Sequence, residues 1–262
     1  MAEYGKGAPL SYARYLKVHE LLDLQHCLSQ PPHPDELLFI VIHQAYELWF
    51  KLILHSLDEC KDALGRGQTG AATLALERVI EIEKLLIQQI HILETMAPAR
   101  FLEFRDRLNP ASGFQSFQFR EIETLAGLAE PAHLDALAGD AAASARLRRR
   151  LEQPNLWHCF SSHLLQRGLS FPPEDPEARC ETLRHIYEHR EAHPELYRLA
   201  EALIGFDEHL QLWRYHHVRM VERMIGFKRG TGGSEGVGYL VQTLGRKCFP
   251  ELWEVRTHLT AQ

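Results

Sequence analysis

Two histidines stand in apolar surroundings where an imidazole could do chemistry. His43 interrupts the most apolar run of the chain, FIVIHQAYELWF, and His217 follows His216 in LWRYHHVRMVERM. Adjacent residues on a helix point about 100° apart, so at most one of His216 and His217 faces a given cavity. A histidine in a core is most simply a packed side chain with a hydrogen-bond partner. Two inward-facing histidines on different helices also suit the two sides of a planar iron cofactor, one as ligand and one as hydrogen-bonding partner.

Arg105 lies between aromatic and acidic neighbours in FLEFRDRL. A guanidinium among aromatic rings can bind a carboxylate through two parallel hydrogen bonds, and apolar neighbours reduce the screening of that pair by water. The carboxylate belongs either to another helix, in an ion pair, or to a ligand. On the residues alone the ion pair is the simpler interpretation.

A glycine-rich segment, GFKRGTGGSEGVG, runs from Gly226 to Gly238. Glycine permits left-handed torsions and close backbone approach, which a phosphate-binding loop or a mobile lid requires. The segment lacks the GK[ST] ending of a P-loop and follows a predicted helix rather than a strand, so neither common nucleotide-binding motif fits. A flexible linker and a lid over a ligand both remain open.

His185, His189 and His193 recur at four-residue steps, which on one helix would place them on one face, where two imidazoles could bind zinc. No cysteine or carboxylate completes a known zinc pattern, and Pro194 follows directly, so we predict a solvated surface there. The arginines of residues 146–150 are likewise expected on a solvated helix face, with no role in nucleic-acid binding.

The elements that must position these residues are helices, because apolar residues return at three- and four-residue steps and stretches of alternating β-branched and aromatic residues are missing. Long helices are predicted from Pro34 to about Gly65, from about Thr69 to about Met96 antiparallel to the first, and from about Pro194 to Ile225. Pro98 begins a short helix, and residues 109–113 break the chain before the next one.

In the second long helix, Leu76, Val79 and Ile82 belong to the predicted buried stripe, whereas Glu83 and Lys84 are predicted to be exposed. Between residues 129 and 176 the composition suggests short helices on the outside of a bundle. We therefore predict an all-α fold, a single-domain helical bundle over residues 1–262 with long antiparallel helices and short peripheral ones.

The composition is that of a globular protein, with 262 residues of which 45% are hydrophobic and 24% charged. A net charge of -6 gives no electrostatic reason to bind nucleic acid or an anionic membrane. Five widely spaced cysteines form no CxxC pair, which argues against a disulfide framework and suits a reducing cytosol. The longest apolar run, Leu37 to Ile42, is too short to span a bilayer, so we predict a cytoplasmic protein that binds neither membrane nor nucleic acid.

Five segments occur in an order that resembles the tryptophan 2,3-dioxygenase family. They are SYARYLKVHELL, LFIVIHQAYELWFKL, FLEFRDRLNPASGFQSFQFREIE, LWRYHHVRMVERMIGFKRGTGGSEGVGYL and FPELWEVRT, and the resemblance extends from the first to the last of them, over nearly the whole chain. The resemblance implies a cytoplasmic homotetramer whose helical bundle encloses haem b. It also implies an activity, the O2-dependent cleavage of the indole C2–C3 bond of L-tryptophan to give N-formyl-L-kynurenine.

The resemblance further implies roles for individual residues. His217 matches the axial ligand of the haem iron, and His43 matches a catalytic histidine that hydrogen-bonds the indole N–H. The other substrate-binding positions match Phe39, Phe101, Arg105 for the carboxylate, Thr231 for the amino-acid end, and Tyr12, Tyr15 and Leu16 of an N-terminal segment (residues 1–30) that reaches a neighbouring subunit's site.

Some positions depart from the family's motifs. Ala45 and Tyr46 stand where small hydroxyl side chains are expected, His216 stands where arginine is usual, and the residues near Gly127 and at His19 also differ. Changes near a pocket can alter the substrate or the fate of the second oxygen atom. A haem-dependent monooxygenase that forms an oxindole from tryptophan or a substituted tryptophan is therefore the alternative, and a haem or tryptophan sensor without turnover is a weaker one.

Overall fold

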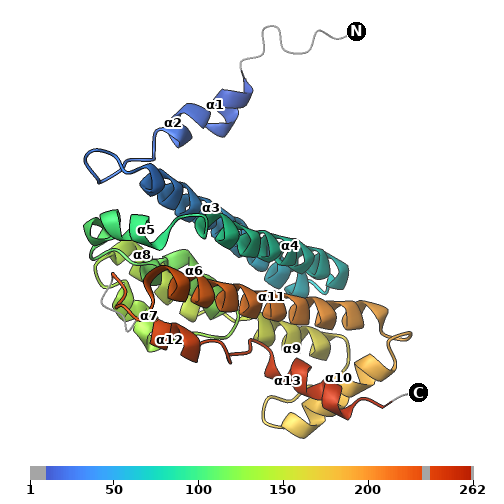
Figure 1. Cartoon of the computed structure of the whole chain (residues 1–262). Helices are drawn as coiled ribbons and strands as arrows, with labels where there is room; N and C mark the ends of the chain where they lie inside the picture. Colours follow the sequence, from blue (N-terminus) through green and yellow to red (C-terminus); the bar gives the residue numbers. More distant parts are fainter. Residues whose placement is uncertain (1–9, 232–236, 261–262) are drawn as a thin grey trace.

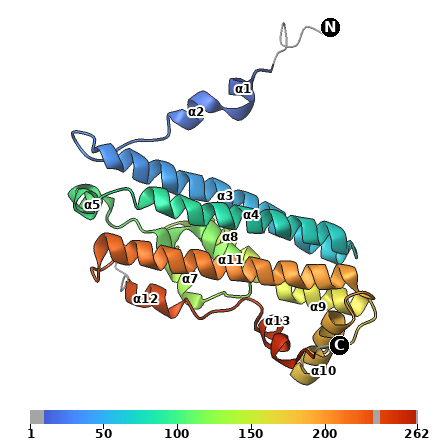
Figure 2. The same ribbon diagram turned by 45° about the vertical axis from the view of Figure 1, so that its right-hand side comes forward.

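Three long helices form the frame of the protein. The computed structural model describes residues 10–231 and 237–260, and every regular element in this part is a helix, which confirms the all-α prediction. Helices α3 (Pro34–Gly65), α4 (Thr69–Leu93) and α11 (Pro194–Ile225) lie side by side (Figures 1 and 2). Both α4 and α11 run opposite to α3, and α4 packs against both of the others.

Shorter helices surround this frame. They are α1 (Tyr12–Leu16), α2 (Val18–Leu22), α5 (Pro98–Arg105), α6 (Phe117–Leu125), α7 (Pro131–Ala136), α8 (Ala141–Leu151), α9 (Leu156–Gln166), α10 (Pro176–Glu188), α12 (Val237–Gln242) and α13 (Pro250–Glu254), with 3-10 turns at 106–108, 113–115 and 255–258. Helices α5, α7 and α12 lie at the end of the bundle where α3 begins, and α10 and α13 lie at the opposite end (Figure 1).

Proline and glycine explain the ends of the long helices. Pro34 and Pro194 occupy first-turn positions, where a missing N–H costs no helical hydrogen bond. Gly226 ends α11 with a φ of 58°, a torsion that glycine adopts without strain. The second long helix ends at Leu93, three residues before the predicted Met96. Apart from that end, the long helices match their predicted bounds.

The hydrophobic core joins the long helices to α9. Leu156, Phe160 and Leu164 of α9 are fully buried, and this helix packs against α3. The prediction that the short helices between residues 129 and 176 stay on the outside was therefore wrong for α9. Its apolar residues recur every four positions, which is enough for a short helix to enter a core.

The arginines of α8 are only partly a solvated face. Arg150 donates two hydrogen bonds to the Asp58 carboxylate of α3, at 2.6 and 3.0 Å. Arg146 donates to the buried Glu121 of α6 at 2.7 Å. These two side chains fix α8 against α3 and α6, whereas Arg148 and Arg149 are exposed as predicted.

Exposed apolar side chains gather on α3 and on the N-terminal helices. By length and composition α3 could cross a membrane, but it packs against α4, α5, α6 and α9 as a core helix does. Its outer face leaves Leu37 and Leu48 exposed. Helices α1 and α2 project beyond the start of α3 (Figure 2), and Tyr12 and Tyr15 are 78% and 71% exposed. Exposed apolar side chains that gather in one region are typical of interaction sites.

Two acidic side chains are buried where α4 meets α11. Asp207 accepts hydrogen bonds from the backbone N–H of Cys248 (3.0 Å) and Phe249 (3.1 Å) and from the indole N–H of Trp253 (2.8 Å). These bonds tie the C-terminal segment to α11. Glu83 is buried as well, so the prediction that it is exposed was wrong. Burial, and secondly the Asp207 carboxylate, raise the pKa of Glu83 well above its ordinary value, although Arg214 opposes the shift.

This raised pKa makes the stability of the protein depend on pH. A carboxyl whose pKa rises on folding contributes its full stability below its unfolded pKa and loses it as the pH rises toward the folded pKa. Glu83→Gln, which imitates the neutral carboxyl, should match the wild type in urea unfolding near about pH 4.5 and become progressively more stable than it between about pH 5 and pH 8.

The matched control is Glu81→Gln on the same helix, where the exposed Glu81 pairs with Lys84 at 2.7 Å. This variant should show no such trend, because a surface pair contributes little. A difference between Glu83→Gln and the wild type that stays constant across the pH range would contradict a neutral Glu83.

Candidate active site

A cavity of about 300 Å³ lies between the first part of α3 and the last part of α11. Its remaining walls come from the end of α4 with Met96 beyond it, from α5, α6 and α12, and from the segments at residues 112–116 and 230–231. His43 follows the start of α3 at Pro34 by nine residues, and His217 precedes the end of α11 at Ile225 by eight. Because the two helices are antiparallel, both histidines reach the same end of the bundle, and both line the cavity.

The α11 wall holds His217 in a neutral form. Trp213, one turn earlier, stacks on the imidazole with ring centroids 5.2 Å apart and an angle of 12° between the planes. Burial, and to a smaller extent His43 and Arg120, lower the pKa of His217 to about 4. His216 does not line the cavity, and its ring lies 5.7 Å from that of His91 on α4. The structure thus selects one of the two adjacent histidines.

The α3 wall holds His43 in one tautomer. A backbone carbonyl can only accept, so the 2.7 Å hydrogen bond between His43 Nδ1 and the Phe39 carbonyl requires a proton on Nδ1. Burial lowers the pKa of His43, although the Phe39 carbonyl and Glu47 oppose the shift. In the resulting neutral ring, Nε2 is an acceptor.

Aromatic rings continue this wall. The Phe39 ring lies 4.0 Å from the His43 ring and stacks on Phe101 at 5.7 Å. Phe104 packs edge-on against Phe39 from behind and is almost fully buried. Both Phe39 and Phe101, which the sequence assigns to a substrate pocket, line the cavity.

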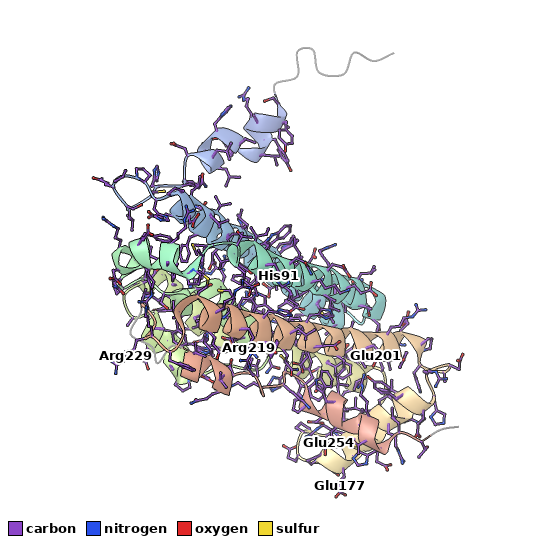
Figure 3. All side chains as sticks on the ribbon, viewed as in Figure 1. His91, Glu177, Glu201, Arg219, Arg229 and Glu254 are labelled. Atoms are coloured by element: carbon purple, nitrogen blue, oxygen red, sulfur yellow. The ribbon has the colours of Figure 1, made fainter. Side chains whose placement is uncertain are left out.

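Arg105 and Thr231 line the cavity where two segments meet. The Arg105 guanidinium donates to the backbone carbonyl of Arg229, which lies just beyond the end of α11 (Figure 3). The Thr231 hydroxyl donates to the Ala111 carbonyl at 2.6 Å. In the described part of the chain no carboxylate forms an ion pair with Arg105. The interhelical ion pair that the sequence left open is therefore absent there.

The remaining predicted residues lie elsewhere or beyond what is described. Tyr12, Tyr15 and Leu16 are exposed on α1 and do not line this cavity. Residues 1–9 of the N-terminal segment and residues 232–236 of the glycine-rich segment lie outside the described residues. The N-terminal contact with a neighbouring subunit and the lid therefore stay predictions.

A buried network of charges, which the sequence reasoning missed, also lines the cavity. Glu123 of α6 pairs with Arg214 of α11 at 2.8 Å and with Arg120 at 2.7 Å. Arg120 also donates to His133 Nε2 at 3.1 Å. A sequence signal for this network is present in FQFREIE. There Arg120 and Glu123, three residues apart, lie beside aromatic residues that predict burial.

The donors in this cavity fit a haem. No group of three or more His, Cys, Asp or Glu in the described residues is arranged to hold a bare metal ion. A porphyrin brings four nitrogen ligands of its own and needs one neutral imidazole, and His217 presents an imidazole of that kind to the cavity. Phe119 and Trp213 supply apolar walls for a planar ring. These observations define a class of protein, an all-α bundle whose mostly apolar pocket has a neutral imidazole on each side.

Comparison with known proteins identifies the family within this class. The family model described as tryptophan 2,3-dioxygenase matches residues 2–138 and 177–259. Curated tryptophan 2,3-dioxygenases from Nocardioides sp. and Herpetosiphon aurantiacus are 47% and 45% identical to this chain, covering 97% and 95% of it and 96% and 98% of their own lengths. One from Myxococcus xanthus is 42% identical over 95% of this chain and 90% of its own. The chain belongs to the tryptophan 2,3-dioxygenase family, as its motifs predicted.

Proposed function

We propose that this protein uses haem b and O2 to cleave the indole C2–C3 bond of L-tryptophan, giving N-formyl-L-kynurenine. The observation that carries the proposal is the pair of neutral imidazoles, from α3 and α11, in one mostly apolar cavity. Membership of the tryptophan 2,3-dioxygenase family supports the substrate and the reaction.

His217 is the proposed axial ligand of the iron. A ligand must present an unprotonated nitrogen, and the lowered pKa of His217 keeps its imidazole neutral over the physiological range. The stacked Trp213 restricts the rotation of the ring and excludes water from one of its faces. When bound, haem supplies the electronic activation of O2.

His43 is the proposed partner of the indole N–H. Its Nδ1–H is committed to the Phe39 carbonyl, so Nε2 is left to accept a hydrogen bond from a donor on the substrate. The hydrogen bond would fix the indole ring within the cavity. Orientation of this kind supplies much of the rate enhancement when the reactive group belongs to a cofactor.

Phe39, Phe101, Arg105 and Thr231 are the proposed binding groups for the rest of the amino acid. The two phenylalanine rings offer apolar contact to the indole plane, and the Arg105 guanidinium has N–H groups in excess of the one that binds the Arg229 carbonyl. A substrate carboxylate would accept hydrogen bonds from those remaining N–H groups of Arg105. Thr231 would contact the amino-acid end, and the glycine-rich segment that contains it would close over the substrate.

Assembly and location are proposed on the same grounds. We infer one domain over residues 1–262, a homotetramer, and a cytoplasmic location without nucleic-acid or membrane partners. The exposed Tyr12, Tyr15 and Leu16 on α1 suit a contact with a neighbouring subunit's site.

A haem-dependent monooxygenase of tryptophan or a substituted tryptophan is the second candidate. One observation favours it, because the bulky Tyr46 lines the cavity one turn after His43 and its hydroxyl donates to the Leu86 carbonyl at 2.8 Å. A ring at that point would change how the substrate lies. A sensor that binds haem or tryptophan without turnover is the remaining alternative.

The product distinguishes these candidates. Reduced, haem-loaded protein is given L-tryptophan and O2, and the product mass is measured. We expect a gain of both oxygen atoms, as in N-formyl-L-kynurenine. A gain of one atom would establish the monooxygenase, and binding without turnover would establish the sensor.

Replacing His217 tests the ligand. His217→Ala should lose the haem absorbance of the reconstituted protein, because no other described imidazole lies on the α11 wall of the cavity. His216→Ala is the matched control, because the side chain of His216 lies outside the cavity. This variant should load haem normally. Equal haem loading in both variants would show that His217 is not the axial ligand of the haem iron.

Replacing Arg105 tests the carboxylate contact. Arg105→Leu should weaken tryptophan binding by about 2 to 5 kcal/mol, the usual cost of removing one member of a desolvated charge pair. Spectral titration of the haem-loaded protein with L-tryptophan measures this loss. The control is Arg107→Leu, two residues away and outside the cavity wall, which should bind as the wild type does. Unchanged affinity in Arg105→Leu would contradict the assignment.

A further inference from the structure

Three histidines come together at the turn between α10 and α11, at the end of the bundle far from the cavity. The sequence predicts them on one helical face, but α10 ends at Glu188, His189 caps it, and His193 directly precedes α11. The backbone N–H groups of Ala192 and His193 donate to the His189 carbonyl, at 2.9 and 3.1 Å. This turn folds His193 back toward the last turn of α10.

The fold-back places two imidazole nitrogens side by side. Nε2 of His185 and Nε2 of His193 are 3.2 Å apart, with ring centroids 5.1 Å apart. The His189 ring packs on the other side of His185 at 4.4 Å, and its Nδ1–H donates to the His185 carbonyl at 3.1 Å. The His185 ring is therefore held between two others, with its Nε2 directed at His193.

We propose that His185 and His193 form a surface site for a divalent transition metal such as Zn²⁺. Zinc binds imidazole nitrogen at about 2.0 to 2.1 Å. Two nitrogens at that distance from one ion and 3.2 Å from each other subtend an angle of about 100 to 105° at the metal. That angle is close to tetrahedral, so the distance between the two nitrogens suits one ion, toward which each ring would turn.

The chemistry of the pair favours a metal over a bare contact. Between two imidazoles one nitrogen must donate and the other accept, and at an exposed position water competes for both. A zinc ion accepts both lone pairs at once, and imidazole is among the ligands it prefers. In the described residues no third His, Cys, Asp or Glu completes this site, so water fills the other positions and binding is weaker than at a structural zinc site.

This site is independent of the cavity. His193 directly precedes α11 and His217 lies within it 24 residues further along, which corresponds to about 36 Å along the helix axis. Figure 3 labels Glu201 toward the site's end of α11 and Arg219 toward the cavity's end. A bound ion would join the end of α10 to the start of α11 and stabilise the folded protein by linkage.

Zinc titration of the haem-loaded full chain tests the site, with a chromogenic zinc chelator as competitor. In the wild type, the His185–His193 pair should bind one Zn²⁺ with higher affinity than the other surface histidines do. His185→Ala and His193→Ala should each weaken that binding at least about tenfold, because a single imidazole remains. His158→Ala is the control, an exposed histidine whose Nδ1 contacts Asn155 at 2.7 Å, and it should bind as the wild type does.

Thermal unfolding gives a second readout that does not depend on competition. Zn²⁺ should raise the unfolding midpoint of the wild type and of His158→Ala, and should leave that of His193→Ala unchanged. Equal zinc affinity, or an equal shift of the midpoint, in His193→Ala and the wild type would overturn the proposal. The haem spectrum should stay constant throughout, so a failure here leaves the proposed activity unaffected.

Discussion

The cavity depends on the antiparallel arrangement of α3 and α11, which brings the first part of one helix to the last part of the other. Helices α3 and α11 have 32 residues each and pack chiefly against α4, which has 25. At 1.5 Å per residue, α4 is about 10 Å shorter than either of them. Leu93, its last residue, and Met96 beyond it line the cavity. His43 of α3 and His217 of α11 line the same cavity, so the last residue of α4 and the segment after it complete a site whose two histidines come from the other helices.

Such a space must be lined without leaving charges unpaired. Burying Arg120, Glu123 and Arg214 costs desolvation free energy, and their mutual pairing offsets it. The pairs also fix the rotation of α11 relative to α6, because Arg214, one turn before His217, is held by Glu123 of α6. The charged network and the stacked Trp213 therefore act together, one holding the helix and the other holding the imidazole of His217.

Periodic apolar residues, prolines and glycines predicted the long helices and their ends, because these signals act locally. The same reasoning failed where a partner comes from a distant segment. Glu83 looks like a surface residue until α11 brings Asp207 beside it, and Arg150 looks solvated until Asp58 of α3 pairs with it. Motifs, rather than spacing, distinguished His217 from His216, since two adjacent histidines are equivalent to any periodicity argument. The cavity itself is lined by segments from α3 to α12, and their meeting at one end of the bundle is a tertiary feature that no local signal predicts.

The three hydrogen bonds to Asp207 have a consequence for synthesis of the chain on the ribosome. Residues 248, 249 and 253 supply all of these donors, and they are made after the whole of α11. Until they emerge, Asp207 lacks these N–H partners at the α4–α11 contact. The nascent chain therefore cannot complete its core as the helices appear in order. These hydrogen bonds form only after residues 248–253 have been made, and a chain that stops before them lacks these donors.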